Sequence, residues 1–362
     1  MSKSVWFCPE CQSEGSDSGL EFCASDGARL RPIASRGAEW VGRVLADKYR
    51  IVRFIDSGGT AEVFEAERLS SGKRVAVKLL HAAFAGTPLA VDRFLQEARL
   101  VSRIAHPNVV EIFDFGTLPG AVQYMAMELL AGRSLASELA RRPLPLSAAL
   151  NFALQACEGL AAAHERGVIH CDVKPANLFL LEVPGGGDRV VKILDLGIGR
   201  MQAHGPESGF ADSGLVAGTP EYMSPEQASA LPMGPATDIY AMGVVLWEML
   251  LGTVPFEAST YSEVLSKQVY ENPVWPVDLA AARVVPLAAG PIVLRALAKK
   301  PRDRQASMLD LQREVASLAS IERTRQRETN RPKAIDVTPP DAPPRASRPP
   351  PSLSESSSRV RR

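Results

Sequence analysis

The residues best suited to chemistry lie in the stretch from Val168 to Leu180. Asp172, Lys174 and Asn177 share a short loop between two apolar runs. A carboxylate can accept a proton, an ammonium can hold a phosphoryl oxygen, and an amide oxygen can bind a metal ion. Asp195 follows the strand-like run 191–194 and lies two residues before Gly197, where it is placed to hold a hard cation.

Two upstream features suit chemistry on a phosphate. Lys78 closes the apolar run 75–78, from which its ammonium can enter a cleft, and Glu97 in the following segment can pair with it. The loop 55–63 contains Gly58 and Gly59, and small residues let backbone N–H groups approach phosphates closely. Each feature also has an ordinary interpretation, a solvated strand end for Lys78 and a simple turn for the glycines.

The elements that must position these groups follow from hydrophobic periodicity. Alternating runs predict strands at 49–55, 63–67, 74–80, 109–115 and 122–128. Apolar residues at spacings of three and four predict helices over 91–101 and 147–164, the second with Ser147 as N-cap and Gly167 as its stop. The nearly all-apolar segment 238–251 predicts a helix buried on most sides. The pattern is a β-rich lobe followed by an α-rich lobe, and active sites often lie between such units.

Composition limits the class of protein. The 362 residues are 46 % hydrophobic and 23 % charged, with 41 basic and 41 acidic residues, so no global charge favours nucleic acid as a partner. The five cysteines lack the regular spacing of a disulfide framework. The first residues hold no signal-peptide run, and no apolar stretch of about 18 residues predicts a membrane segment. We therefore expect a cytoplasmic protein.

The order and spacing of these motifs, with Gly218 to Glu226 and the later Asp238 and Arg304, resemble the protein kinase family. The resemblance is to bacterial eukaryote-like (Hanks-type) Ser/Thr kinases and covers about residues 49–320. It implies an α+β, two-lobed protein-kinase fold, with a small β-rich N-lobe carrying one key helix and a larger α-helical C-lobe. It also implies a phosphotransferase that moves the γ-phosphoryl group of ATP to Ser or Thr of protein substrates in bacterial signalling.

The resemblance assigns roles to the loop residues. Asp172 would orient the substrate hydroxyl and accept its proton, while Lys174 would steady the phosphoryl group and favour Ser/Thr over Tyr as acceptor. Asn177 and Asp195 would hold Mg²⁺.

The resemblance also defines the ATP site. Lys78 would contact the α- and β-phosphates and pair with Glu97. Adenine would lie between Val63 and Ala76 on one side and Phe179 on the other, with Met127 behind it and the backbone of residues 128–130 beside it. The implied nucleotide-binding residues are Ile55, Asp56, Ser57, Gly58, Gly59, Thr60, Ala61, Glu62, Val63, Ala76, Lys78, Met127, Glu128, Leu130 and Phe179. Thr219 would shape the substrate groove, and Glu226 and Arg304 would form a buried structural ion pair.

The chain departs from the family pattern at three motifs, and the expected consequences differ. The glycine motif has Asp56 and Ala61 at its first and third positions, which predicts weaker ATP binding. Cys171 replaces the arginine that meets a phosphorylated activation loop, so we expect little dependence on phosphorylation there, for instance at Ser208 or Ser213. Cys171 itself is interpreted as a packing residue, with a redox role as the alternative. Leu196 in place of the usual phenylalanine keeps the apolar role.

Two rival functions stay open. A pseudokinase-type scaffold with weak ATP binding would account for the altered glycine loop and the missing arginine. A small-molecule kinase of similar fold is disfavoured by the run Gly218 to Glu226, which shapes a peptide groove in protein kinases.

The ends of the chain differ from its centre. Cys8, Cys11, Cys23 and Asp26 resemble the ligands of a short zinc ribbon, predicting a structural Zn²⁺ site in residues 1–30 against the alternative of free thiols. Such a module would contact a protein partner. A linker is expected over 31–48, a kinase domain over 49–320, and a disordered Pro/Ser/Arg-rich tail over 321–362. That tail has eight prolines, with ten basic and five acidic residues, a net charge of +5.

Overall fold

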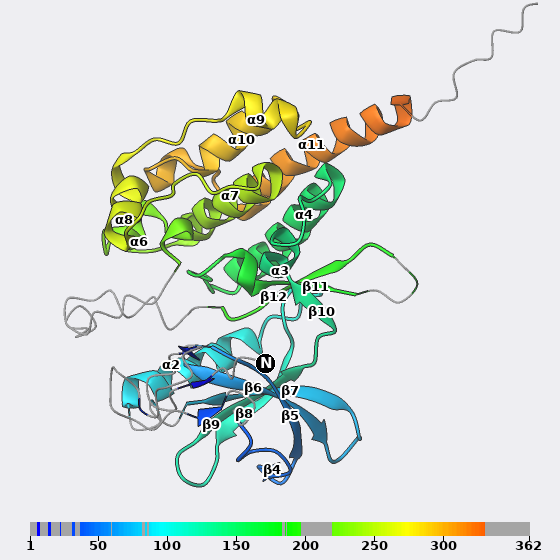
Figure 1. Cartoon of the computed structure of the whole chain (residues 1–362), viewed down its shortest axis with the longest axis vertical. Helices are drawn as coiled ribbons and strands as arrows, with labels where there is room; N and C mark the ends of the chain where they lie inside the picture. Colours follow the sequence, from blue (N-terminus) through cyan, green and yellow to red (C-terminus); the bar gives the residue numbers. More distant parts are fainter. Residues whose placement is uncertain are drawn as a thin grey trace, which may run out of the picture.

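The computed structural model describes residues 37–58, 60–81, 84, 87–182, 185, 187–196 and 219–329, together with residues 6–7, 14–15, 22 and 31–32 near the N-terminus. These residues form two lobes, a twisted antiparallel sheet with one long helix and a bundle of helices (Figure 1). The two-lobed α+β fold expected from the sequence is confirmed.

The sheet of the small lobe has six strands in the order β4-β5-β6-β7-β9-β8, and every neighbouring pair is antiparallel. The strands are β4 (Val44–Leu45), β5 (Tyr49–Ser57), β6 (Ala61–Arg68), β7 (Arg74–Leu80), β8 (Ile112–Thr117) and β9 (Gln123–Glu128). Successive side chains of β7 enter opposite cores, because Ala76 and Leu80 face the cluster beneath helix α2 while Val77 and Leu79 face the outer cluster around Tyr49. Burial on both faces explains why β7 is apolar almost throughout.

Helix α2 (Pro88–Val101) covers one face of this sheet. Proline occupies its first turn, where the missing N–H removes no helical bond. Phe94, Ala98 and Val101 are buried at spacings of four and three, which turns Glu97 of the same helix toward the lobe interface.

The large lobe is mostly helical. Its helices are α3 (Leu135–Leu139), α4 (Leu146–Glu165), α6 (Pro225–Ala228), α7 (Pro235–Leu251), α8 (Tyr261–Tyr270), α9 (Val277–Ala282), α10 (Ala289–Ala296) and α11 (Met308–Thr329). Short 3₁₀ turns are η2 (Pro175–Asn177), η3 (Pro220–Tyr222) and η4 (Pro301–Asp303). A small sheet, β10 (Gly132–Ser134), β11 (Leu178–Leu181) and β12 (Val190–Ile193), lies at the junction of the lobes.

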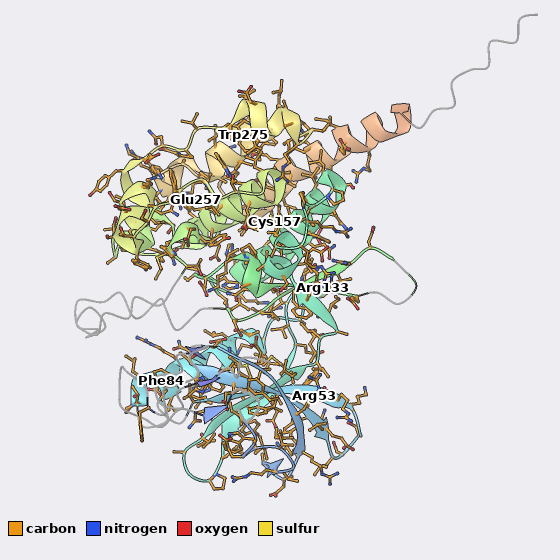
Figure 2. All side chains as sticks on the ribbon, viewed as in Figure 1. Arg53, Phe84, Arg133, Cys157, Glu257 and Trp275 are labelled. Carbon is orange, nitrogen blue, oxygen red and sulfur yellow. The ribbon has the colours of Figure 1, made fainter. Side chains whose placement is uncertain are left out.

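Helix α7 is the centre of the large lobe and is buried along nearly its whole length, as its apolar sequence predicted. Gly243 on α7 permits a close approach of α10, since a Cβ at this position would meet Ala296 at 2.8 Å. Among the described residues, no helix is both long and apolar enough to cross a membrane. Figure 2 shows Cys157, a fully buried residue of α4, within this lobe, and Arg133 near its border with the small lobe.

Several element boundaries differ from the sequence prediction. Helix α4 begins at Leu146, before the predicted cap Ser147, and Pro145 occupies its N-cap position without a side-chain hydrogen bond. Residues 109–110 do not extend β8 but pair with Ile193 of β12. Strand β4 lies within the expected linker 31–48 and pairs with β5.

The two ends of the chain are only partly described. Helix α11 continues to Thr329, nine residues into the segment 321–362 predicted as disordered. Strands β1 (Trp6–Phe7), β2 (Glu14–Gly15) and β3 (Arg31–Pro32) form a separate antiparallel sheet. The predicted zinc ligands Cys8, Cys11, Cys23 and Asp26 lie outside the described residues, as do residues 330–362.

Candidate active site

Lys78 stands between two carboxylates at the junction of the lobes. It is the fifth residue of β7, and its Nζ atom lies 2.6 Å from Oδ1 of Asp195 and 3.9 Å from Oε1 of Glu97. The side chains of Lys78 and Glu97 are 12 % and 18 % exposed, so this contact is largely shielded from water. The structure thus brings the predicted pair together and adds Asp195 as the nearer partner of the ammonium.

Burial and the neighbouring charges shift the pKa values of Lys78 and Glu97 in opposite directions. Burial alone would lower the pKa of Lys78, but the carboxylates of Asp195 and Glu97 outweigh it and hold that pKa above its usual value. Burial raises the pKa of Glu97 to about 7 against the opposing attraction of Lys78. Lys78 is therefore a permanent cation near neutral pH, as contact with phosphate oxygens requires.

The loop 170–177, which we name the catalytic loop for its predicted role, brings the other predicted groups together. Nζ of Lys174 lies 3.0 Å from Oδ2 of Asp172. Nδ2 of Asn177 donates to the Asp172 backbone carbonyl at 2.8 Å and to Oδ2 of the same residue at 3.2 Å. Turn η2 places Asn177 just before β11. The Asp172 carboxylate is therefore held in one orientation by a cation and an amide.

Asn177 and Asp195, the predicted Mg²⁺ ligands, are drawn together by the backbone. The N–H of Leu194, next to Asp195, donates to the carbonyl of Asn177 at 2.8 Å. An amide oxygen and a carboxylate suit Mg²⁺, which usually takes one or two protein ligands and completes its shell with phosphate oxygens and water. Within the described ranges, no group of three or more His, Cys, Asp and Glu side chains forms a further metal cluster.

Asp238 fixes the backbone of the catalytic loop, a role the sequence did not reveal. From the first turn of α7, its carboxylate accepts hydrogen bonds from the N–H groups of His170 and Cys171, both at 2.8 Å. Cys171 has a φ of +60°, which is unfavourable for a residue with a side chain. The two bonds stabilise this strained backbone directly before Asp172, while the ring of His164 contacts the same carboxylate at 2.7 Å.

Cys171 is 3 % exposed, so its side chain is directed into the protein. This position agrees with the packing interpretation and leaves no exposed cation there to meet a phosphorylated loop. Ser208 and Ser213 lie outside the described residues, whereas Thr219 lines a small pocket together with Asp172, Tyr222 and Met223.

The glycine loop joins β5 and β6, and Gly59 within it lies outside the described residues. The N–H of Gly58 donates to the carbonyl of Ala61 at 2.9 Å, closing the hairpin. Among the described residues, a Cβ at Gly58 would touch that carbonyl alone, at 3.8 Å, and the φ of Gly58 lies outside the left-handed region. Neither packing nor backbone conformation requires glycine here, which favours a ligand that approaches the backbone.

The two departures in this loop have different environments. Ala61 is 2 % exposed and its methyl group joins the core, so the residue replaces a glycine without entering the cleft. Asp56 is exposed, and its Oδ1 accepts from the N–H of Ser57 at 2.8 Å. The carboxylate thus bonds the N–H of the next residue and places a negative charge on this loop.

The remaining nucleotide-site residues lie on both sides of the lobe junction. Ala76 and Met127 are opposite one another across the β7–β9 pair, and both are buried. Val63 of β6 lies opposite Lys78 of β7, whereas Phe179 belongs to β11 of the large lobe. Glu128 ends β9, where its side chain accepts from Lys192 at 2.5 Å. The other predicted positions are Ile55, Thr60, Glu62 and Leu130, of which Glu62 is 9 % exposed.

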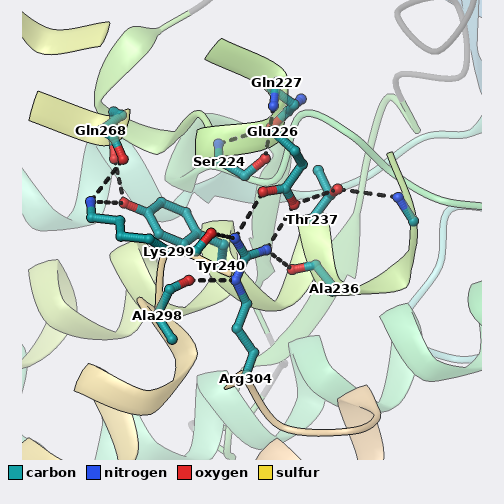
Figure 3. Close-up of polar contacts among 11 residues, drawn as sticks. Ser224, Glu226, Gln227, Ala236, Thr237, Tyr240, Gln268, Ala298, Lys299 and Arg304 are labelled. Carbon is teal, nitrogen blue, oxygen red and sulfur yellow. Dashed lines mark hydrogen bonds and ion pairs between the residues drawn. The ribbon is translucent and has the colours of Figure 1, made fainter. Parts of the chain in front are cut away.

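The predicted ion pair between Glu226 and Arg304 is present and buried. Two parallel bonds of 2.7 and 2.8 Å join the guanidinium and carboxylate, whose side chains are 0 % and 5 % exposed. Burial alone would raise the pKa of Glu226, but the Arg304 guanidinium outweighs it and holds the pKa below its usual value. Figure 3 shows that Arg304 also donates to the backbone carbonyl of Ala236, and that Thr237 donates to the same carboxylate.

Comparison with known proteins agrees with this arrangement. The sequence profile described as "Protein kinase domain" matches residues 49–314. The chain is 39 % identical over 281 residues to serine/threonine-protein kinase Pkn1 of Myxococcus xanthus, covering 77 % of this chain and 39 % of Pkn1. For pkn3 of the same organism the identity is 36 % over 298 residues, covering 82 % of this chain and 54 % of pkn3.

A solved structure gives the same result for the fold. A double mutant of the Mycobacterium tuberculosis PknI kinase domain superposes with a TM-score of 0.60 at 25 % identity, covering 77 % of this chain and 98 % of that chain. The chain belongs to the protein kinase family. It spans about 39–54 % of the length of the two curated Myxococcus relatives.

Proposed function

We propose that this chain is an ATP-dependent Ser/Thr protein kinase that phosphorylates protein substrates in bacterial signalling. The observation that carries the proposal is the pairing of two clusters, Lys78 with Glu97 and Asp195, and Asp172 with Lys174 and Asn177. The first set has the charge to bind a nucleotide phosphate, and the second set holds a carboxylate beside a cation for transfer. The relatives of this chain are named as Ser/Thr kinases, which supports the choice of acceptor.

In this proposal each group has one task. Lys78 binds phosphate oxygens, and Glu97 keeps its ammonium in place. Asp172 accepts the hydroxyl proton of the substrate as the new O–P bond forms, and Lys174 offsets the charge on the transferring group. Asn177 and Asp195 are the residues that would hold Mg²⁺, which supplies charge neutralisation at the phosphates.

The proposal is tested by following the transfer of labelled γ-phosphate from ATP–Mg²⁺ to a generic basic protein and to the chain itself. Phosphate recovered on serine or threonine, and not on tyrosine, is the expected result. A folded protein that binds ATP without any transfer would instead support the pseudokinase-type scaffold.

Removing the charge of Asp56 should improve nucleotide binding. We expect Asp56→Gly to lower the KM for ATP roughly two- to tenfold, because it removes an exposed carboxylate from the loop that is proposed to approach the phosphates. Steady-state kinetics with varied ATP measure the effect. Asp56→Asn separates charge from hydrogen bonding, because it keeps an acceptor while losing the charge, and an unchanged KM in both variants would contradict the hypothesis.

Activity should be nearly independent of activation-loop phosphorylation. We expect the double replacement Ser208→Ala, Ser213→Ala to keep the initial rate within roughly twofold of the parent, because Cys171 supplies no cation for a phosphate. Initial rates before and after phosphatase treatment provide the measurement. Loss of activity in the double variant would refute this expectation.

The N-terminal segment is proposed to hold a structural Zn²⁺ ion and to contact a protein partner. Metal analysis of the purified chain should find about one zinc per molecule, since three thiolates and a carboxylate complete a tetrahedral shell. Replacing Cys8 and Cys11 together by Ser should remove the zinc, whereas Cys157→Ala should retain it. A zinc-free parent, or zinc retained in the double variant, would refute the site.

The cytoplasmic location and the domain boundaries at 30, 48 and 320 stay predictions.

A further inference from the structure

His81 joins the glycine loop to strand β7, which carries Lys78. It follows β7 directly and is 6 % exposed. Its backbone N–H donates to the carbonyl of Thr60 at 2.9 Å. Because Ala61 already pairs with Leu80, this bond extends the ladder of β6 and β7 by one residue into the loop.

The side chain of His81 reaches further, to the other side of the hairpin. Its Nε2 atom lies 3.0 Å from the carbonyl oxygen of Gly58 and 3.5 Å from Oγ of Ser57. A carbonyl oxygen can only accept a hydrogen bond, so Nε2 carries the hydrogen and donates it. One buried residue therefore contacts the loop through Thr60 after the turn and through Gly58 before it.

These contacts act on the part of the loop that would approach phosphate. The family pattern has glycines at the positions of Asp56 and Ala61, and here a Cβ on Gly58 would meet the Ala61 carbonyl at 3.8 Å, an ordinary contact. Gly58 and Gly59 leave the backbone of this loop conformationally free, so a side chain that holds it in one conformation before binding lowers the entropy lost on binding. The buried imidazole supplies such an interaction from a strand that is itself fixed in the sheet.

We propose that His81 is a positioning residue of the nucleotide site, which holds the glycine loop in its binding conformation through the hydrogen bond to Gly58. The proposal rests on the kinase function proposed above. It assigns to His81 no contact with the reacting atoms; its effect on ATP acts through the loop.

The test compares two replacements of His81. The amide nitrogen of Gln can take the place of Nε2 and donate to Gly58, whereas Phe fills the same space without a donor. In the nucleotide-free protein, we expect backbone amide exchange over residues 55–63 to accelerate roughly two- to tenfold in His81→Phe and to stay near the parent rate in His81→Gln. Titration with ADP should show a weaker Kd for the Phe variant by a similar factor.

Kinetics give the signature that a general loss of structure would not. The KM for ATP should rise in His81→Phe while kcat is retained, and His81→Gln should restore the KM. If the larger ring lowers the melting temperature, His81→Leu removes the donor with less volume and takes its place. Parental exchange and ADP binding in the variants without a donor, or equal defects in the Gln and Phe variants, would overturn the proposal.

The exchange and ADP measurements do not require turnover. If the parent binds ADP but transfers no phosphate, the proposed function fails while these two measurements still decide the role of His81.

Discussion

Asp172→Asn should reduce phosphoryl transfer roughly 10²- to 10⁴-fold, the range expected when a general base is removed. The amide occupies the same space and keeps an oxygen facing Lys174 and Asn177, but it cannot take up the hydroxyl proton. The loop geometry, held by Asp238 from helix α7, should be unchanged. The rate of transfer from labelled ATP to a protein substrate measures the loss, while the affinity for ADP should stay near that of the parent.

Asp278→Asn is the matched control, an exposed acid on α9 that undergoes the same chemical change far from the loop. It should transfer phosphate at the parental rate. A variant of Asp172 that keeps its activity would remove the central group from the proposed mechanism, and the scaffold interpretation would then gain weight.

Arg304→Gln should produce the largest loss of stability, about 3–5 kcal/mol, because it leaves the buried Glu226 without its counter-charge. The guanidinium also donates to the backbone carbonyls of Ala236, Ala298 and Lys299, and those acceptors lose their partner as well. Denaturant unfolding measures the effect. Arg302→Gln, whose side chain is 79 % exposed, is the control and should change the free energy of unfolding by less than about 1 kcal/mol.

The pH dependence of this variant tests the cause. In the parent, Arg304 holds the pKa of Glu226 below its ordinary value of 4.5, so the pair stabilises the fold above that pH and loses its effect as pH falls through the folded pKa. Without Arg304, burial raises the pKa of Glu226, and the sign reverses. The deficit of Arg304→Gln should therefore be smaller at about pH 5 than at pH 8. A deficit that does not change with pH would show that lost packing, and not unpaired charge, is responsible.

Local sequence patterns predicted most of the fold. The strand 74–80 and the buried helix ending at Leu251 were placed by apolar runs, since burial on both sides leaves a continuous hydrophobic signal. The ends of elements follow less directly from such runs. The predicted cap at Ser147 is wrong because helix α4 already begins at Leu146, and α11 extends past residue 321 because its polar end still forms helical backbone bonds.

The predicted site residues came from motif order, but their supports could not be found that way. Asp238 meets the catalytic loop across 67 and 68 residues of sequence, and His81 meets Gly58 across 23. Such contacts depend on how the elements pack, and an isolated Asp or His has no local pattern that indicates its partner. The same limit applies to Lys78, since only the packed lobes show that Asp195 lies nearer than Glu97.

The bonds from Asp238 also link the active site to the order in which the protein unfolds. The catalytic loop keeps its strained backbone only while α7 is packed in the centre of the large lobe. Partial denaturation that releases α7 must therefore destroy catalysis at the same step. The described part of the glycine loop is bonded within the small lobe, where Gly58 contacts Ala61 and His81, so we expect it to keep its structure after the catalytic loop is lost.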